Sequence, residues 1–396
     1  MDHCITQNNV DSSLTLGNLF KEDLPEGYIL PVYPCSINNQ FRCYNEAKYR
    51  LFAIDEIAAE DWFVFLQSLR ICCVAGNDLP IVLPRLPSEF ALAHWKKWCP
   101  HFIDPVIKTV DVGLADSNTL VTYFPFDAIP RERHAVDPEM HYHILKKSAI
   151  AETGAPHPKY YKKNDIKFPC MIKLDQSLGG FGNYVVENRE KFEEVSNMIN
   201  TRFGSDSSYV ISEYIQDVQC ILACGFYVGK SGRIRLFGIQ ECTMEIFAHI
   251  GGYIDWNKHE QYKQQLYRKF VVPVSNYLHK KGYFGIVGLD IIRSPSGDYL
   301  VDMNSRVNGS TPVLILSHHM MELGFSHSRY DKCNIYNMTS KQLVEKANSI
   351  NEKTSNARIV ILATADEGKK CRASVAAFSD SKEMVDSLQD QLCYNE

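Results

Sequence analysis

The chain has 396 residues, of which 45% are hydrophobic and 22% charged, and its formal net charge is -5 at pH 7. This is the composition of a globular protein with enough apolar residues for more than one core. The acidic balance, with no basic stripe that carries interleaved aromatic residues, argues against nucleic acid as a partner. The longest apolar runs, such as residues 359–363, are far too short to cross a bilayer, so no membrane partner is expected.

The start of the chain lacks the basic stretch and apolar core of a secretory signal. The thirteen cysteines are scattered and contain no CxxC pair. We therefore expect reduced thiols in a cytoplasmic protein and no structural zinc, although spacing alone leaves a catalytic Cys–His pair open. Residues 1–25 are polar and predict a mobile N-terminus.

Residues 26–137 alternate short apolar runs with turn residues and helical patterns, which predicts an N-terminal α/β domain. No glycine fingerprint stands at a strand-to-helix turn, so dinucleotide binding is unsupported there. A helix is predicted to start after the cap residue Asp137 and to close at Gly154. Prolines after this helix predict an extended linker.

A glycine loop follows, between predicted strands at residues 168–175 and 183–187. Gly179, Gly180 and Gly182 allow backbone N–H groups to approach an anion closely, and Lys173 on the first strand adds a point charge for phosphate oxygens. The alternative is a mobile hairpin turn beside a solvated lysine. The spacing is not that of a Walker A loop.

A helix over residues 190–203 and a strand over residues 209–215 come next. The strand ends in Glu213, Tyr214 and Ile215, whose backbone groups could meet an adenine edge. Taken alone, the segment is better explained as an ordinary strand with one surface carboxylate.

Residues 285–306 predict two apolar strands joined by a Pro-Ser-Gly turn. Asp290 lies on the first strand, and Asp302, Asn304 and Arg306 follow on the second at every other position, so these three share one face. Hard oxygen ligands hold Mg²⁺ on a polyphosphate, while arginine neutralises charge on a phosphoryl group. A polar outer face is the alternative, but Asp and Asn are depleted from strands, which favours a functional patch.

The remaining features are less specific. His318 and His319 are interpreted as a helix-surface pair and not as a metal site. Residues 331–396 predict a helix at 340–350, a strand at 357–364 and a last helix at 381–392. They are interpreted as a small appended α/β lobe.

Taken in order, these motifs resemble the ATP-grasp superfamily of carboxylate–amine and carboxylate–thiol ligases, over roughly residues 138–312. The most specific part is an acidic residue followed about a dozen residues later by acidic-x-Asn-x-Arg, and Asp290 and Asp302 are twelve apart. The resemblance implies an α/β (α+β) ATP-grasp fold. Its expected parts are an N-terminal domain (26–137), a glycine-loop lid (138–215), a catalytic ATP- and metal-binding lobe (216–330) and a C-terminal appendage (331–396).

The resemblance also implies ATP and Mg²⁺ as cofactors. The implied metal ligands are Asp290, Asp302 and Asn304, and Arg306 would contact the transferring phosphoryl group. The implied nucleotide contacts are Lys147 (preferred over Lys146), Lys173, the lid glycines Gly179, Gly180 and Gly182, and the adenine hinge Glu213, Tyr214 and Ile215. The family usually has Glu where Asp302 stands, and its ribose-binding Glu is replaced here by Asp217 or Gln219.

The implied activity is an ADP-forming ligase. A carboxylate attacks the γ-phosphate of ATP to give an acyl phosphate, and an amine then displaces phosphate to form an amide. Amino acids or small peptides are the expected substrates. Ser310 and Thr311 either line the substrate pocket or form a plain turn. A homodimer is possible, since homodimers are common in this family. The alternatives are a non-catalytic ATP-binding regulatory protein and a small-molecule phosphotransferase.

Overall fold

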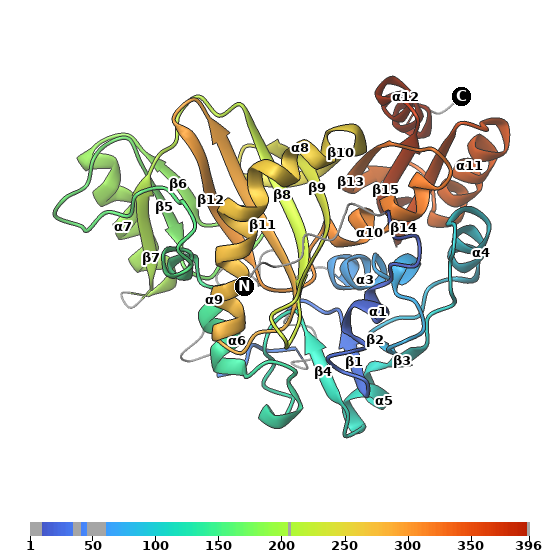
Figure 1. Ribbon diagram of the computed structural model, residues 1–396, viewed down its shortest axis with the longest axis horizontal. Helices are drawn as coiled ribbons and strands as arrows, with labels where there is room; N and C mark the ends of the chain where they lie inside the picture. Colours follow the sequence, from blue (N-terminus) through green and yellow to red (C-terminus); the bar gives the residue numbers. More distant parts are fainter. Residues whose placement is uncertain (1–9, 35–40, 46–60, 205–206, 394–396) are drawn as a thin grey trace.

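The computed structural model describes residues 10–34, 41–45, 61–204 and 207–393 (Figure 1). Its N-terminal part is built on a four-stranded parallel sheet of order β3-β2-β1-β4, as the α/β pattern predicts. The strands are β1 (Gly27–Leu30), β2 (Ile81–Leu83), β3 (Ile107–Thr109) and β4 (Thr119–Thr122). The helices are α1 (Leu16–Phe20), α3 (Asp61–Leu69), α4 (Glu89–Trp98) and α5 (Val110–Ala115), with short 3₁₀ turns at η2 (Cys72–Val74) and η3 (Arg131–Arg133).

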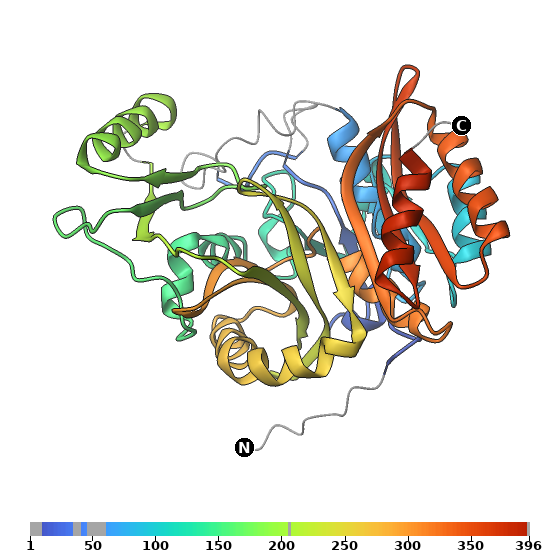
Figure 2. The same ribbon diagram turned by 90° about the horizontal axis from the view of Figure 1, so that it is seen from above.

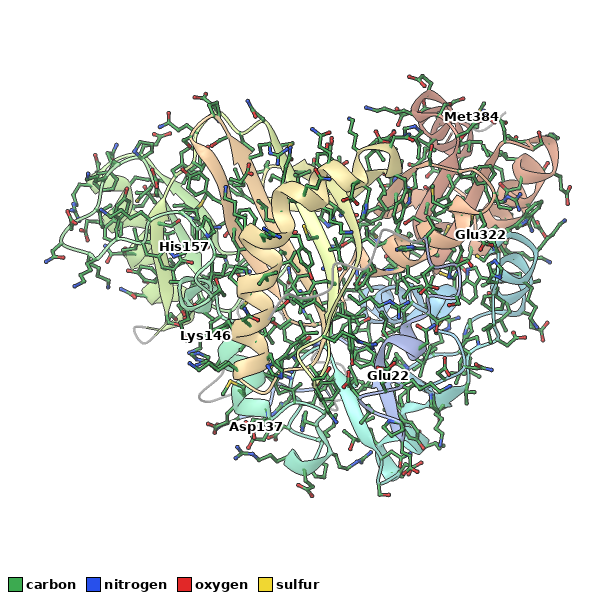
Figure 3. All side chains as sticks on the ribbon, in the orientation of Figure 1. Glu22, Asp137, Lys146, His157, Glu322 and Met384 are labelled. Carbon is green, nitrogen blue, oxygen red and sulfur yellow. The ribbon has the colours of Figure 1, made fainter. Side chains whose placement is uncertain are left out.

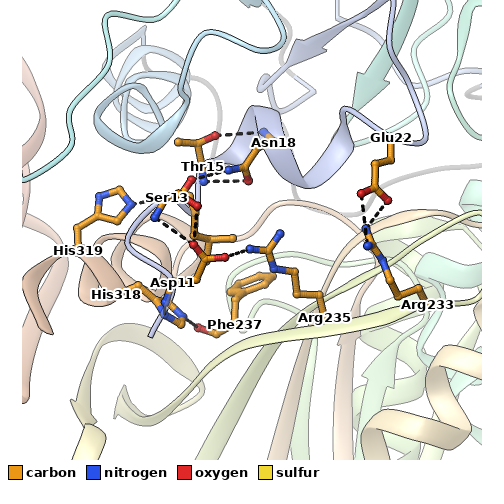
Figure 4. Close-up of polar contacts among 11 residues, drawn as sticks. Asp11, Ser13, Thr15, Asn18, Glu22, Arg233, Arg235, Phe237, His318 and His319 are labelled. Atoms are coloured by element: carbon orange, nitrogen blue, oxygen red, sulfur yellow. Dashed lines mark hydrogen bonds and ion pairs between the residues drawn. The ribbon is translucent and has the colours of Figure 1, made fainter. Parts of the chain in front are cut away.

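The segment before β1 is held on the rest of the molecule (Figure 4). Thr15 and Asn18 form a capping box at α1, and the backbone N–H of Asp11 donates to Nδ1 of His318 over 3.2 Å. Asp11 also pairs with Arg235. The predicted mobile N-terminus is therefore wrong for residues 10–25, while its first nine residues lie outside the described part.

The predicted pair His318 and His319 is buried, which corrects its assignment to a helix surface. Both side chains lie in α10 (Thr311–Met321), where Nε2 of His318 meets the Phe237 carbonyl and Nε2 of His319 meets the Leu14 carbonyl, each at 2.7 Å. The N-terminal segment covers this helix, so a contact remote in sequence decides the burial.

The predicted helix after Asp137 is divided in two. Asp137 caps α6 (Pro138–Leu145), but Lys146 is extended and a 3₁₀ helix, η4 (Lys147–Glu152), follows before Gly154. Lys147 is therefore the first residue of η4 and not part of α6.

The segment predicted to form the lid, called the lid below, contains a separate three-stranded antiparallel sheet of order β6-β5-β7 with one helix on it. Its elements are β5 (Cys170–Leu174), β6 (Asn183–Val186), α7 (Arg189–Phe203) and β7 (Tyr209–Glu213), close to the predicted ranges. Asn188 caps α7, and Gly204 ends it with φ +96°. In both views the lid and the C-terminal helices lie at opposite ends of the central sheet (Figures 1 and 2).

The central sheet has eight antiparallel strands in the order β12-β11-β8-β9-β10-β13-β15-β14. The strands are β8 (Cys220–Val228), β9 (Ile234–Glu245), β10 (Ala248–Asp255), β11 (Gly285–Ser294), β12 (Gly297–Asn304), β13 (His327–Tyr336), β14 (Ala357–Glu367) and β15 (Lys370–Ser379). One face of β8 and β9 is covered by α8 (Trp256–Leu266) and α9 (Val272–Lys280), which are joined by a π-helical turn, η5 (Tyr267–Val271) (Figure 2).

The C-terminal residues extend this sheet and do not form a detached appendage. The predicted boundary at residue 331 falls inside β13, which pairs with both β10 and β15. Two helices, α11 (Ser340–Lys353) and α12 (Lys382–Cys393), bury their apolar faces with β14 and β15 in a core of their own. The predicted divisions at 137 and 215 remain proposals.

Across the described ranges, no helix combines the length and apolar character needed to span a membrane. The cysteines in this part of the chain are all free thiols.

Candidate active site

The predicted site residues come together around one cavity of about 690 Å³. Its walls are the lid, the β11–β12 hairpin, the β9–β10 turn and α3. It is lined by the predicted residues Lys147, Lys173, Gly179, Gly180, Glu213, Tyr214, Ile215, Asp290, Asp302, Asn304 and Arg306. Among the predicted metal, phosphoryl and nucleotide contacts, Gly182 is the one outside this lining.

The two acids face each other across the hairpin. Asp290 of β11 is directly paired with Asp302 of β12, and the register then shifts so that Ile291 opposes Leu300. Val301 is therefore an extra residue, and its carbonyl accepts a hydrogen bond from Nζ of Lys173 at 3.2 Å. The bulge thus links the hairpin to the lid strand β5.

The charges of the hairpin are unequal because Lys147 pairs directly with Asp302. Burial and the neighbouring Asp302 carboxylate raise the pKa of Asp290 to about 7. Although burial alone acts to raise it, the charge and hydrogen bond of Lys147 hold the pKa of Asp302 below its usual value. Burial and the Lys147 charge lower the pKa of Lys173 to about 8. Asp302 is thus the more readily ionised carboxyl group of the pair, and the repulsion between the two carboxylates makes Asp290 harder to ionise.

Lys147 is held in position through its backbone. Its N–H donates to the Asp175 carbonyl at 2.8 Å, and its own carbonyl accepts from the Tyr160 hydroxyl at 2.9 Å. The Asp175 carboxylate also accepts from the N–H and hydroxyl of Ser148 at 2.7 and 2.9 Å. Lys146, which lies at the end of α6 opposite Asp137 (Figure 3), is not among the cavity-lining residues. The structure therefore places Lys147 at the cavity.

Arg306 is buried just beyond β12, which ends at Asn304, so the prediction that it lies on that strand is wrong. It donates to Oδ1 of Asn304 at 2.7 Å and to the Tyr33 hydroxyl at 3.0 Å. Its Nε has no hydrogen-bond partner within the described residues. The guanidinium is fixed by the N-terminal domain on one side and by the hairpin on the other, with capacity left for one more acceptor.

The glycine loop approaches the β9–β10 turn closely. Gly180 has φ +85°, and a Cβ built on it would lie 2.2 Å from the Phe247 carbonyl oxygen. Gly179 has φ +63° but faces open space, whereas a Cβ on Gly182 would lie 2.7 Å from Leu174. Gly182 therefore shapes the turn while Gly179 and Gly180 face the cavity.

The predicted hinge follows the end of β7. Glu213 is the last residue of that strand, and Tyr214 and Ile215 continue along the cavity. Apolar side chains also line the cavity and provide an apolar slot of the kind that accepts a base. They are Met171, Leu178, Val218, Ile221, Met244 and Ile292. Asp217 and Gln219, the candidates for the ribose contact, are exposed and do not line it.

Several lining residues were not predicted from the sequence: Tyr33, Phe63, Gln67, His249 and Lys332. They come from the N-terminal domain and from β10 and β13, so no local pattern joins them. Ser310 and Thr311 were predicted either to line the substrate pocket or to form a plain turn. Ser310 lines the cavity, whereas Thr311 is buried outside it.

The hairpin residues fit a magnesium ion by their chemistry. Two carboxylates and the Asn304 amide oxygen are hard donors, and that oxygen keeps a free lone pair beside its bond to Arg306. A divalent cation would relieve the repulsion that raises the pKa of Asp290. Within the described ranges, no cluster of three or more His, Cys, Asp or Glu side chains offers a rival metal site.

Comparisons with known proteins bear on the family and the fold. Residues 143–310 match the family model described as the ATP-grasp domain, so this part of the chain is an ATP-grasp domain. The match contains every predicted site residue, and the fold class predicted from the motifs is confirmed.

One curated relative is 31% identical over 96 residues, a 5-formaminoimidazole-4-carboxamide-1-(beta)-D-ribofuranosyl 5'-monophosphate synthetase of Pyrobaculum calidifontis. That match covers 24% of this chain and only 27% of the relative.

Two solved structures share the fold. The N5-carboxyaminoimidazole ribonucleotide synthetase of Thermus thermophilus has a TM-score of 0.54 at 12% identity, covering 83% of this chain and 96% of that one. The N5-carboxyaminoimidazole synthase of Aspergillus clavatus, solved with ADP and 5-aminoimidazole ribonucleotide, has a TM-score of 0.51 at 13% identity, covering 93% and 98%. At these identities the likeness concerns the fold alone.

Proposed function

We propose that this protein is an ATP-dependent, ADP-forming ligase that joins a carboxylate to an amine. One observation carries the proposal: facing carboxylates, Lys147, Lys173 and Arg306 line a single cavity beneath a glycine loop. The ATP-grasp match and the ADP named with the Aspergillus clavatus structure support ATP as the nucleotide.

In this proposal the base lies in the apolar slot beside Glu213, Tyr214 and Ile215. Lys147 and Lys173 contact phosphate oxygens, and Gly179 and Gly180 close over them. Asp290, Asp302 and Asn304 hold Mg²⁺, which supplies charge neutralisation on the polyphosphate. Lys147 would then share its charge between Asp302 and the nucleotide.

The carboxylate of the first substrate attacks the γ-phosphate, and ADP leaves. Arg306, with its unpartnered Nε, stabilises the charge on the transferring phosphoryl group. The resulting acyl phosphate reacts with the amine to form an amide and release phosphate. The protein contributes positioning and exclusion of water, because an open lid would let the acyl phosphate hydrolyse.

As substrates we propose amino acids or small peptides, on the strength of the motif resemblance. The names of the relatives instead include ribonucleotides, so a test should offer both classes. We further propose that the protein forms a homodimer and that it is cytoplasmic. The free thiols support the cytoplasmic location, while the homodimer needs a separate measurement. Size-exclusion chromatography with light scattering provides it.

The test is ADP release by the purified protein with Mg-ATP, alone, with pooled carboxylates, and with the same pool plus amines. The pools contain amino acids, dipeptides and ribonucleotides, and mass spectrometry searches for condensed products. ADP that requires both pools, with a product lighter than its parts by one water, supports the ligase. ADP with carboxylates or hydroxyl compounds but without amines indicates a phosphotransferase, and nucleotide binding without ADP indicates a regulatory protein.

A further inference from the structure

A second group of charges lies in the wall of the cavity, away from the predicted motifs. Arg70 follows α3 directly and is 2% exposed. One of its terminal nitrogens donates to Oε1 of Gln67, which lines the cavity. Its Nε and its other terminal nitrogen have no hydrogen-bond partner among the described residues. A buried guanidinium with two unused donors requires an acceptor.

Lys332 reaches the same wall from the central sheet. Along β13 the register with β15 shifts between Asp331 and Asn334, so that Lys332 and Cys333 together oppose a single residue, Ser374. A bulge of this kind changes the direction in which the side chain of the extra residue points. Burial, with the positive charges of Arg70 and Arg306, lowers the pKa of Lys332 to about 8, so the ammonium remains charged at neutral pH.

Gly309 leaves a hollow between these two cations. A Cβ built on Gly309 would lie 3.4 Å from the unpartnered terminal nitrogen of Arg70 and 3.8 Å from Cε of Lys332. Gly309 and its neighbours Asn308 and Ser310 line the cavity at the start of α10, where the helix dipole adds positive potential. We call Arg70, Lys332 and Gly309 the cationic wall.

The cationic wall has no ion-pair partner in the described part of the chain, and the attraction of the Asp290 carboxylate for Lys332 is weaker than the repulsion from Arg70 and Arg306. Neither Arg70 nor Lys332 forms an ion pair there, and Lys147 already occupies Asp302. His249, also in this wall, is neutral, because burial and the charges of Lys332 and Arg70 lower its pKa to about 3. Burying an uncompensated cation is unfavourable, so the fully buried Arg70 with the partly buried Lys332 beside it calls for an anion from outside.

We propose that the cationic wall binds an anionic group of the substrate, a carboxylate or a phosphate distinct from the phosphates of ATP. Lys332 and the backbone around Gly309 make the direct contacts, while Arg70 acts from behind as a positioning residue that orients Gln67 and adds charge. This inference rests on the proposed function, since it assumes a nucleotide at the hairpin. It narrows the substrate to molecules with an acidic group besides the one that is activated.

The probes are inorganic phosphate and succinate, titrated by calorimetry into the full chain saturated with a non-hydrolysable ATP analogue and Mg²⁺. We expect saturable binding of at least one probe, and the tighter probe distinguishes a phosphate from a carboxylate subsite. Lys332→Met should weaken binding by about tenfold or more, as expected for loss of a charge-assisted contact. Gly309→Ala should weaken it too, because the methyl group enters the hollow while every charge is retained. Lys369→Met, an exposed lysine on the β14–β15 turn, is the matched control and should bind as the wild type does.

Equal affinity in wild type, Lys332→Met and Gly309→Ala would overturn the subsite, as would absence of saturable binding. Competition between the probes and the nucleotide would also overturn it, because the cations would then belong to the ATP phosphates. Nucleotide affinity is measured separately in each variant. Nucleotide binding without anion binding refutes the subsite alone, while anion binding without nucleotide binding refutes the proposed function and leaves the cationic wall as an anion site.

Discussion

The hairpin and the cationic wall share one cavity but treat charge in opposite ways. At the hairpin, Asp290 and Asp302 are met by Lys147 and Lys173, so most charges are compensated within the protein. At the cationic wall, Arg70 and Lys332 form no ion pair among the described residues, and the attraction of Asp290 for Lys332 does not offset the repulsion from Arg70 and Arg306. The hairpin is suited to a cation-bound polyphosphate, whereas the wall is complete only with an external anion.

The largest expected effect comes from removing the paired acid. Asp302→Ala should lower ADP formation by roughly a thousandfold, because it removes a metal ligand and releases Lys147 from its partner. The fold should persist, since Asp302 lies at the cavity and not in the apolar core. Steady-state ADP release and thermal unfolding of the same preparation measure both.

Asp298→Ala is the matched control on the same hairpin, because Asp298 pairs with Arg293 and does not line the cavity. It should keep near-normal turnover. Wild-type rates in Asp302→Ala would refute the metal assignment.

The glycine loop gives the next largest effect. Gly180→Ala forces a side chain into left-handed backbone and against the Phe247 carbonyl, so turnover should fall by roughly one to two orders of magnitude. Gly179→Ala carries the same backbone strain but meets no atom within 4 Å, so its loss should be several-fold smaller. ADP release in the two variants measures the difference. Equal losses would show that strain alone, and not the close approach to the β9–β10 turn, controls the loop.

A smaller effect should follow from loosening Lys147. Asp175→Ala removes the carboxylate that holds Ser148, leaving the backbone N–H of Ser148 without its acceptor. Displacement of Lys147 should raise the KM for ATP by about tenfold with a smaller change in kcat. Ser208→Ala removes only one hydroxyl bond to Asp175 and serves as the control. An unchanged KM in Asp175→Ala would mean that Lys147 does not depend on this anchor.

The smallest effect concerns pH. His141 of α6 makes a 3.0 Å hydrogen bond to the Ser305 carbonyl, and burial lowers its pKa to about 4. The folded state therefore prefers neutral His141, whose contribution to stability is complete above pH 6.5 and is lost as the pH falls from 6.5 towards 4. At pH 5 the loss is on the order of 2 kcal/mol. Urea unfolding at pH 7 and pH 5 should show a weaker acid dependence in His141→Gln than in the wild type, and an equal dependence would contradict this.

The sequence was sufficient for the hairpin because its chemistry is local. Asp302 and Asn304 alternate along β12, and strand geometry alone places them on one face. The same holds for the capped start of α6 at Asp137 and for α7. Predictions from local patterns of this kind hold in the folded structure because no distant contact is needed to form these elements. Arg306 lies beyond the end of β12, and its hydrogen bonds to Asn304 and Tyr33 position its guanidinium instead.

The cationic wall could not be predicted because long-range pairing creates it. Arg70 and Lys332 meet only when β13 joins the central sheet and its bulge turns Lys332 towards α3. The break of the predicted helix at Lys146 has a similar cause, since contacts of Asp175 and Tyr160 fix the backbone of Lys147. Tertiary contacts therefore override local helical preference at the point where the site is assembled.

The most direct test of the proposed ligase follows an oxygen atom. The protein is incubated with Mg-ATP, an amine pool and a pool of amino acids, peptides and succinate labelled with ¹⁸O in their carboxyl groups, and the released phosphate is analysed by mass spectrometry. If the carboxylate attacks the γ-phosphate, amine-dependent ADP release should be accompanied by phosphate carrying one ¹⁸O atom from the acid. ADP release with unlabelled phosphate would contradict an acyl phosphate and with it the proposed reaction.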